Sequence, residues 1–244
     1  MISQILFIIL FGTAVYFFVR NVSKIRRNIF LGKDEKLNDN PSARWKNMAL
    51  MALGQKRMFD RPVAAVLHIL IYVGFILINL EVLEILIDGA FNKHRIFEPI
   101  LSDFYFFLIG FFEVLAAGVL IACVFFLARR FIVKVPRLVH KDLVGFPVRD
   151  ATYILIIEIL LMGAVLLMNI MDTDLQDVAI LPISSLFVPL IQNMPLDTMH
   201  VVERTAWWGH LVGILLFLNY LPCLLKLTVK MVILEQEELD PQNL

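Results

Sequence analysis

The sequence predicts an all-α integral membrane protein, a bundle of five transmembrane helices. Of its 244 residues, 59% are hydrophobic, and the mean hydropathy is +0.79. A water-soluble core of this size could not bury so much apolar surface. The hydrophobic residues also gather in five runs of about 20 residues, the length of a helix that crosses the hydrocarbon core of a bilayer. These runs are roughly residues 2–19, 63–87, 105–128, 152–171 and 205–225 or somewhat beyond.

Two apolar segments need a separate interpretation. The chain begins MISQILFIILFGTAVYFFVR, without a basic n-region or a small-residue cleavage site, so we expect a retained first span rather than a signal peptide. Between the fourth and fifth runs, residues 179–195 are apolar but contain Pro182, Pro189 and Pro195. Because proline interrupts a helix, we expect a short interfacial or re-entrant segment there instead of another span.

The distribution of lysine and arginine predicts the orientation of the bundle. Residues 20–61 hold eleven of these cations and residues 129–149 hold six, which together are 17 of the 22 in the chain. The two other loops hold only Lys93 and Arg95. The positive-inside rule therefore places the first and third loops in the cytoplasm, the N-terminus outside and the C-terminus in the cytoplasm.

The same pattern divides the chain into a membrane domain of residues 1–234 and a short acidic cytoplasmic tail of residues 235–244. The cytoplasmic loop, about residues 20–62, contains an amphipathic helical stretch after Asn40, for which Ser42 is a candidate cap. The basic face of this loop has two interpretations. It either binds anionic lipid headgroups or forms a docking surface for a soluble electron-carrying partner.

Charge and cysteine content exclude several other classes of protein. The 22 basic and 22 acidic side chains balance, so no basic surface for nucleic acid is expected. The two cysteines, Cys123 and Cys223, each lie inside an apolar run, without the spacing of a zinc site or an iron–sulfur cluster.

The five histidines fall into two groups. His94 and His140 lie in loops near cationic residues, and His200 lies near the start of the fifth span, so all three are expected at the surface. His68 lies five residues into the second span, about 7 to 8 Å below its inner boundary, and His210 is comparably deep below the outer boundary of the fifth span. An ionisable residue at membrane depth indicates a functional site.

The different depths of His68 and His210 mean that they cannot ligate one iron together, so a haem at either would need another ligand. Thr228 lies about five turns below His210, near the level of His68, and residues 77–81 of the second span lie near the level of His210. Neither position offers a second imidazole. The alternative is that each histidine hydrogen-bonds between helices or lines a quinone pocket without touching a metal.

Two runs, ALGQKRMFDRPVAAVLHILIYVGF and WWGHLVGILLFLNYLP, together with five spans and an outer N-terminus, resemble the membrane cytochrome b subunits related to the gamma subunit of respiratory nitrate reductase. More specifically, they resemble the membrane half of heterodisulfide-reductase-like iron–sulfur oxidoreductases. The resemblance covers roughly residues 1–222. It implies b haem between the second and fifth helices, with His68 and His210 as iron ligands, exchange of electrons with the quinone pool, and an iron–sulfur unit on the cytoplasmic side.

The chain departs from this family in two ways. In the family, a histidine-bearing stretch after the Leu-Pro of the fifth helix supplies an inner ligand, but the sequence after Pro222 contains no histidine, and Cys223 and Met231 are weak substitutes. His210 also lacks the second-helix histidine of two-haem members. The cysteine-rich iron–sulfur domain is not found in these 244 residues, so we expect it on a partner.

Further polar residues in the spans have open roles. Glu81 and Glu84 approach the outer end of the second span and are expected to be interfacial, whereas Glu113 and Glu158 lie deeper and are candidates for pairing or for passing a proton from quinol. Arg204 either pairs with a haem propionate or is an ordinary interfacial cation. Five glycines are candidates for close approach of helices or of a macrocycle. These are Gly74, Gly110, Gly118, Gly209 and Gly213.

We therefore predict a haem b anchor subunit of a quinone-linked oxidoreductase in the bacterial inner membrane. It would pass electrons between the quinone pool and a cytoplasmic iron–sulfur protein, with one haem expected and two or none as alternatives. The alternative function is a haem-free membrane scaffold that anchors a redox partner. A small transporter is disfavoured because no inverted repeat or broken half-helix is evident.

Overall fold

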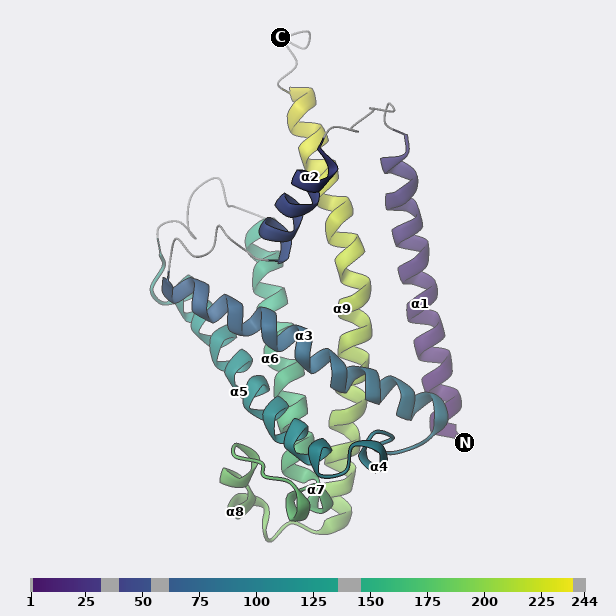
Figure 1. Cartoon of the computed structure of the whole chain (residues 1–244), viewed down its shortest axis with the longest axis vertical. Coiled ribbons are helices and arrows are strands. Elements are labelled where there is room, and N and C mark those ends of the chain that lie inside the picture. The colour runs from purple at the N-terminus through teal and green to yellow at the C-terminus, as the bar shows by residue number, and fades with distance from the viewer. Residues whose placement is uncertain (1, 32–39, 54–61, 136–145, 239–244) are drawn as a thin grey trace. The chain divides into compact units, whose positions relative to one another are not determined.

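The computed structural model describes residues 2–31, 40–53, 62–135 and 146–238, and for 146–148 and 224–238 it describes the backbone alone. Every regular element in this part of the chain is helical, which confirms the all-α class (Figure 1). Five helices dominate: α1 (Ile2–Ile29), α3 (Pro62–Phe91), α5 (Asp103–Phe131), α6 (Phe146–Met171) and α9 (Leu196–Glu238).

Each of the five long helices contains a segment long and apolar enough to cross a membrane, so the chain is a multi-pass membrane protein as predicted. The helices extend beyond the predicted apolar runs because polar residues near the hydrocarbon boundary can continue a helix. The last turn of α1 contains Arg26 and Arg27, and that of α5 contains Arg129 and Arg130. Inside or outside placement of the loops remains a prediction.

The predicted helix after Asn40 is present as α2 (Pro41–Met48), which continues into a π-helical turn, η1 (Ala49–Leu53). The expected cap at Ser42 was wrong. The helix begins at Pro41 and Asn40 is the N-cap, with a left-handed backbone (φ 45°), so Ser42 already lies inside the first turn. Proline is common at the first position of a helix because its fixed φ suits the first turn, where the missing N–H costs no helical hydrogen bond.

The connection between α6 and α9 contains no spanning helix among its described residues, in agreement with the prediction from its prolines. It forms three short pieces: α7 (Thr173–Val178), the 3-10 turn η5 (Ser184–Leu186) and α8 (Val188–Ile191). Another short helix, α4 (Glu98–Leu101), precedes α5. Leu175 and Leu181 pack against Tyr105 and Ile109 of α5, which holds this connection against the bundle.

The chain forms two compact units, Met1–Leu37 with Val212–Leu244, and Asn38–Leu211. In the first unit, the Asn219 side chain of α9 donates a hydrogen bond to the carbonyl oxygen of Ala14 in α1 (3.1 Å). Among the described residues of α1, Phe7 alone is buried. The other described residues of α1 are partly or fully exposed. The predicted boundary at residue 234 falls inside α9, and residues 239–244 of the predicted tail lie outside the described part.

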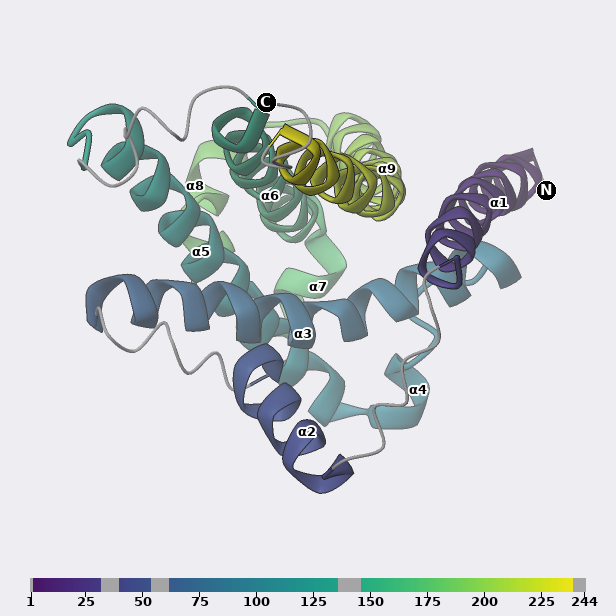
Figure 2. The same cartoon turned by 90° about the horizontal axis from the view of Figure 1, so that it is seen from above.

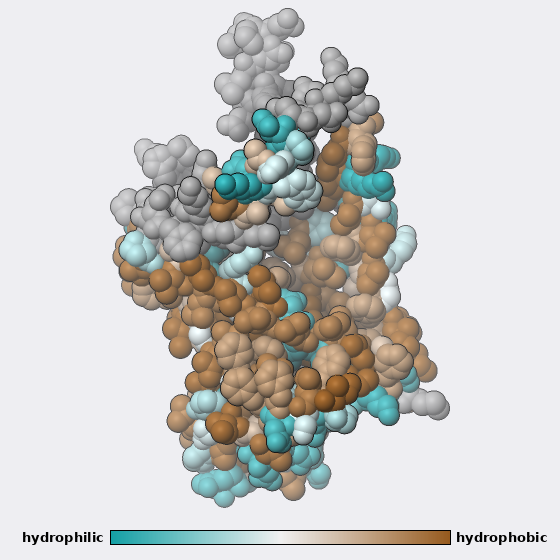
Figure 3. Space-filling view, viewed as in Figure 1, coloured by the Kyte–Doolittle hydropathy of each residue, from teal (hydrophilic) through white to brown (hydrophobic). Residues whose placement is uncertain are grey.

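In the second unit, α5 lies between α3 and α6 and contacts both (Figures 1 and 2). Glycine allows α3 and α5 to approach closely, because a Cβ at Gly74 would overlap Val119 and one at Gly118 would press on Leu70. Figure 3 shows apolar side chains over the middle of α3 and α5, and polar side chains near α4 and α7. This distribution suits helices that face lipid in the middle and water at one end.

Candidate functional site

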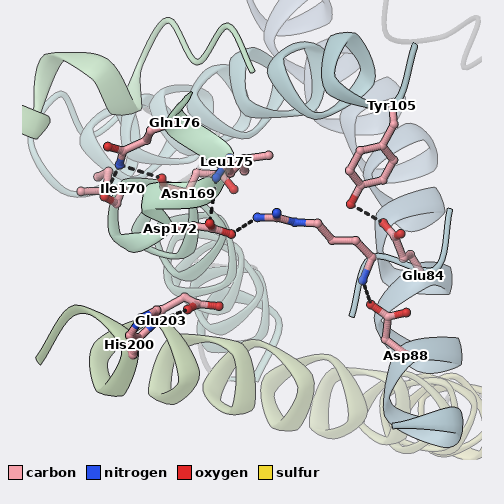
Figure 4. Close-up of polar contacts among 11 residues, drawn as sticks. Glu84, Asp88, Tyr105, Asn169, Ile170, Asp172, Leu175, Gln176, His200 and Glu203 are labelled. Atoms are coloured by element: carbon pink, nitrogen blue, oxygen red, sulfur yellow. Dashed lines mark hydrogen bonds and ion pairs between the residues drawn. The ribbon is translucent and has the colours of Figure 1, made fainter. Parts of the chain in front are cut away.

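Polar contacts concentrate at one end of the second unit, where α3 ends, α5 and α9 begin, and α6 passes into α7. We call this region the acidic end and define it as residues 81–105, 169–186 and 196–207. The positive-inside rule predicts that it lies at the outer face. Figure 4 shows its polar contacts.

Two carboxylates one helical turn apart on α3 bind the loop that follows. Glu84 accepts hydrogen bonds from the N–H of Phe97 (Oε1, 3.0 Å) and from the hydroxyl of Tyr105 (Oε2, 3.0 Å). Asp88 accepts from the backbone N–H groups of residues 95 and 96 (2.7 and 3.1 Å). Both carboxylates are buried, and both of their oxygen atoms have a partner. They therefore fix the path of the chain from α3 to α5.

An ion pair between Arg95 and Asp172 joins the same loop to the end of α6. The side chains are only 12% and 16% exposed, so this pair is largely screened from water. Burial alone lowers the pKa of Arg95, but the Asp172 carboxylate raises it above its ordinary value, so Arg95 stays charged. Asp172 also caps α7 by accepting from the N–H of Leu175 (2.9 Å).

A small cavity of about 70 Å³ lies among these groups. Glu81, Glu84 and Asp88 reach it from one face of α3, because their spacing of three and four residues matches the helical turn. Glu203 and Trp207 reach it from α9, again with a spacing of four. Its other polar lining includes Arg95, Tyr105, Asn169 and Asp172.

His210 lies one turn deeper on this same face of α9, since Glu203, Trp207 and His210 are spaced by four and three residues. Its side chain is 1% exposed, and its Nδ1 atom is buried without a hydrogen-bond partner among the described residues. A buried polar atom normally has a partner, so this imidazole has an unmet requirement. The depth of His210 in the membrane stays a prediction.

His68 lies on α3 about 20 Å from Glu81 along the helix axis, because 13 residues separate them. It is partly buried and makes no hydrogen bond or ion pair with the described residues. The part of the chain that the structure describes contains no group of three or more histidine, cysteine, aspartate or glutamate side chains that could hold a metal ion. His68 therefore belongs to a different part of the bundle from the acidic end.

The remaining cationic candidates lie at the surface. Arg204 is exposed, with its guanidinium over the Trp207 ring at 5.3 Å from the centroid. Six residues separate Arg204 from His210, which places the two about 120° apart around α9. His94 and His200 are exposed, and His200 approaches Glu203 at 3.7 Å. His140 lies outside the described residues.

The deeper carboxylates differ from one another. Glu113 is fully buried and accepts hydrogen bonds from the N–H of Ile183 (3.0 Å), the N–H of Ser184 (3.1 Å) and the Ser184 hydroxyl. This arrangement gives Glu113 a pairing role. Glu158 is buried on α6 and has no hydrogen-bond partner among the described residues, so it stays a candidate for proton transfer.

Sequence reasoning missed the contacts that organise the acidic end. The spacing of Glu84 and Asp88 was a visible signal that the two carboxylates share one face of α3. Arg95 was a second signal, because it is one of only two cations between residues 88 and 104. Its partner Asp172 lies 77 residues away, and no local pattern predicts that contact.

A second cavity, of about 510 Å³, lies between α5 and the segment after α7. Phe106, Phe107 and Phe111 line it, together with Ile180 and Pro182. Its lining contains no histidine among the described residues, so it offers no iron ligand.

Five helices able to cross a membrane, with one fully buried histidine and an acidic end, define a multi-pass membrane protein that has an internal polar site. The chain is 29% identical over 224 residues to the "Probable iron-sulfur-binding oxidoreductase FadF" of Bacillus subtilis (strain 168). The match covers 90% of this chain but about 30% of the length of that protein. No protein-family model and no solved structure matches the chain. The chain is thus distantly homologous to part of this probable iron–sulfur-binding oxidoreductase.

Proposed function

We propose that this protein is the haem b membrane subunit of a quinone-linked oxidoreductase, and that it passes electrons between the quinone pool and an iron–sulfur protein on the cytoplasmic side. Two facts support the proposal. The first is the distant homology to a probable iron–sulfur-binding oxidoreductase over most of the chain. The second is the presence of five helices able to cross a membrane, which would place the chain where quinones dissolve.

The observation that carries the haem assignment is the imidazole of His210. It is buried, and its Nδ1 atom has no partner among the described residues. Imidazole nitrogen is a common axial ligand of haem iron, and a bound haem supplies a one-electron carrier. We therefore propose His210 as one ligand of haem iron near the acidic end.

His68 would serve a separate haem, because it lies toward the opposite end of α3 from the acidic end. We propose His68, whose side chain is partly buried, as the iron ligand of that haem. The described residues assign no second ligand to either histidine. Arg204 is proposed to pair with a haem propionate, and its exposed position beside Trp207 suits a group at the membrane boundary.

The first basic loop is the proposed docking surface for the iron–sulfur protein. None of the residues of α2 is buried, and Trp45 is exposed beside Lys46. An exposed aromatic residue with neighbouring cations suits contact with an acidic partner or with lipid headgroups. Electrons would reach the partner on this side if the positive-inside orientation holds.

An optical spectrum tests the haem assignment. The protein would be purified in detergent from a host supplied with haem, and its dithionite-reduced spectrum would be compared with the oxidised one. We expect a b-type α band that is lost or strongly reduced in His210→Ala and unchanged in His200→Ala, since His200 is exposed. Unchanged pigment in both His210→Ala and His68→Ala would overturn the assignment. A wild-type protein without pigment would favour the haem-free scaffold that anchors a redox partner.

A further inference from the structure

We propose that Glu81 is a proton-exchanging carboxyl group, and that the 70 Å³ cavity of the acidic end is its water-filled connection to the aqueous phase. The source of the proton, a quinol, rests on the proposed function. The cavity and the environment of Glu81 do not.

The argument begins with the contrast between three carboxyl groups on one face of α3. Glu84 and Asp88 have hydrogen-bond donors on both oxygens, from the loop and from Tyr105. Glu81 lies one turn deeper, and its Oε2 atom is buried without a partner among the described residues. Glu81 as a whole residue is only partly buried, but the Oε2 atom of its carboxyl group is buried. Glu84 and Asp88 thus accept structural hydrogen bonds on both oxygens, whereas the Glu81 Oε2 atom accepts none from the described residues.

The cavity can hold water with which Glu81 would exchange its proton. A volume of about 70 Å³ holds roughly two water molecules, at about 30 Å³ each. A buried water needs two to four polar partners, and the lining supplies them. Beside the three carboxyl groups of α3, the titratable groups that face the cavity are His94, Arg95, Tyr105, Asp172 and Glu203. His94 is exposed, so the lining reaches from Glu81 to the surface.

The chemistry follows from this placement. An isolated carboxylate is costly to bury, so Glu81 is expected to hold its proton at rest and to accept a hydrogen bond from cavity water. Oxidation of one quinol to quinone releases two electrons and two protons. In the proposed function the electrons would leave one at a time, through haem iron, to the iron–sulfur protein. Each of the two protons would pass in turn to Glu81, after Glu81 has given its previous proton to the cavity water.

The position of His210 relates the proposed haem to the cavity beside Glu81. Glu203 and Trp207 line the cavity, and His210 follows on the same face of α9 one turn deeper. A quinol that gives electrons to a haem on His210 would therefore release its protons near the deep end of the cavity. Glu81 is the deepest carboxyl group of that lining on α3.

A carbodiimide labelling experiment tests the proposal without any need for haem. Dicyclohexylcarbodiimide modifies protonated carboxyl groups in apolar surroundings. The purified chain would be treated at neutral pH and the modified residues located by peptide mass mapping. We expect label on Glu81 in the wild type and in the control Asp103→Asn, where the replaced carboxylate is exposed at the same end. An observed Glu81 peptide without label would overturn the proposal.

A second measurement tests the role in quinol oxidation. Glu81→Gln is expected to keep the b-type α band and the wild-type melting temperature, but to slow the reduction of haem by added quinol about tenfold or more. Asp103→Asn should leave that rate unchanged. A wild-type rate in Glu81→Gln would overturn the proton-transfer role. A wild-type protein without an α band would instead contradict the proposed function, and the labelling result would still decide whether the Glu81 carboxyl group holds a proton.

Discussion

The Glu113 carboxylate lies inside the second unit, and hydrogen-bond donors of two neighbouring residues surround it. Both backbone N–H groups come from the start of η5, at residues 183 and 184. A non-spanning segment in a membrane protein must satisfy its backbone groups with protein partners, because lipid offers none. Glu113 satisfies this requirement for the turn after Pro182. It therefore explains how a segment that does not cross the membrane can pack against α5.

Replacement of Glu113 by alanine should destabilise the protein. Two backbone N–H groups would lose their acceptor, and each unsatisfied buried group costs about 1–3 kcal/mol, so we expect a loss of about 2–6 kcal/mol. The measurement is thermal unfolding in detergent, followed by reaction of the buried Cys123 thiol in a Cys223→Ser background. Asp177→Ala is the matched control, because that carboxylate is exposed on α7, and it should change stability by less than about 0.5 kcal/mol. Equal stability of Glu113→Ala and its control would contradict this role.

At the scale of the elements, the glycines of the long helices are of two kinds: some lie at contacts between elements, and others have open space around them. Gly74 and Gly118 permit the contact of α3 with α5, and Gly110 permits the carbonyl of Ile180 to approach α5. Gly209, beside His210, has nothing within 4 Å of the position of a Cβ. The proposed approach of a macrocycle to Gly209 stays a prediction, whereas the first three glycines have protein neighbours.

Gly110→Ala and Gly209→Ala form a matched pair of helix substitutions. Alanine gains about 0.5–1 kcal/mol over glycine inside a helix. At Gly110 the new methyl would overlap a backbone oxygen that cannot move without the whole segment, so we expect a net loss of about 1–3 kcal/mol. At Gly209 the gain should appear undiminished. Differential scanning calorimetry in detergent measures both, and a stabilised Gly110→Ala variant would show that this contact is not formed.

The elements themselves followed from hydropathy, since all five spans and the broken connection were predictable from apolar runs and prolines. The ends of the helices were not. Polar residues can continue a helix beyond the hydrocarbon boundary, as at the end of α1. The predicted fifth span already ran past Pro222, and α9 does continue through this proline. The cap at Ser42 was wrong for a different reason, because the helix already starts at the proline one residue earlier.

At the scale of the whole molecule, the orientation is the main prediction that charge distribution makes. We expect the acidic end outside and the first and third loops in the cytoplasm. Asp177→Cys and Ser42→Cys, each in a background without Cys123 and Cys223, would report the two sides. A membrane-impermeant maleimide should label Asp177→Cys in intact spheroplasts and Ser42→Cys only after permeabilisation. The reverse pattern would contradict the orientation.

The candidate site was predictable only in part. Depth along a span selected His210, which is buried, and separated it from His94 and His200, which are exposed. The contacts of Glu84 with Tyr105 and of Glu113 with Ser184 join residues 21 and 71 positions apart, so they depend on how the helices pack. Periodicity within one helix cannot supply that information. The homology to a probable iron–sulfur-binding oxidoreductase supports in part the resemblance that the two histidine-bearing runs had predicted.

Electron transfer from quinol tests the central claim most directly. The purified protein would be mixed with excess quinol under anaerobic conditions while the haem α band is recorded, and dithionite would then be added to measure the total reducible haem. We predict that quinol alone produces a b-type α band that is a substantial fraction of the dithionite signal. A protein whose haem dithionite reduces but quinol does not, or a protein that shows no α band with either, would contradict the account.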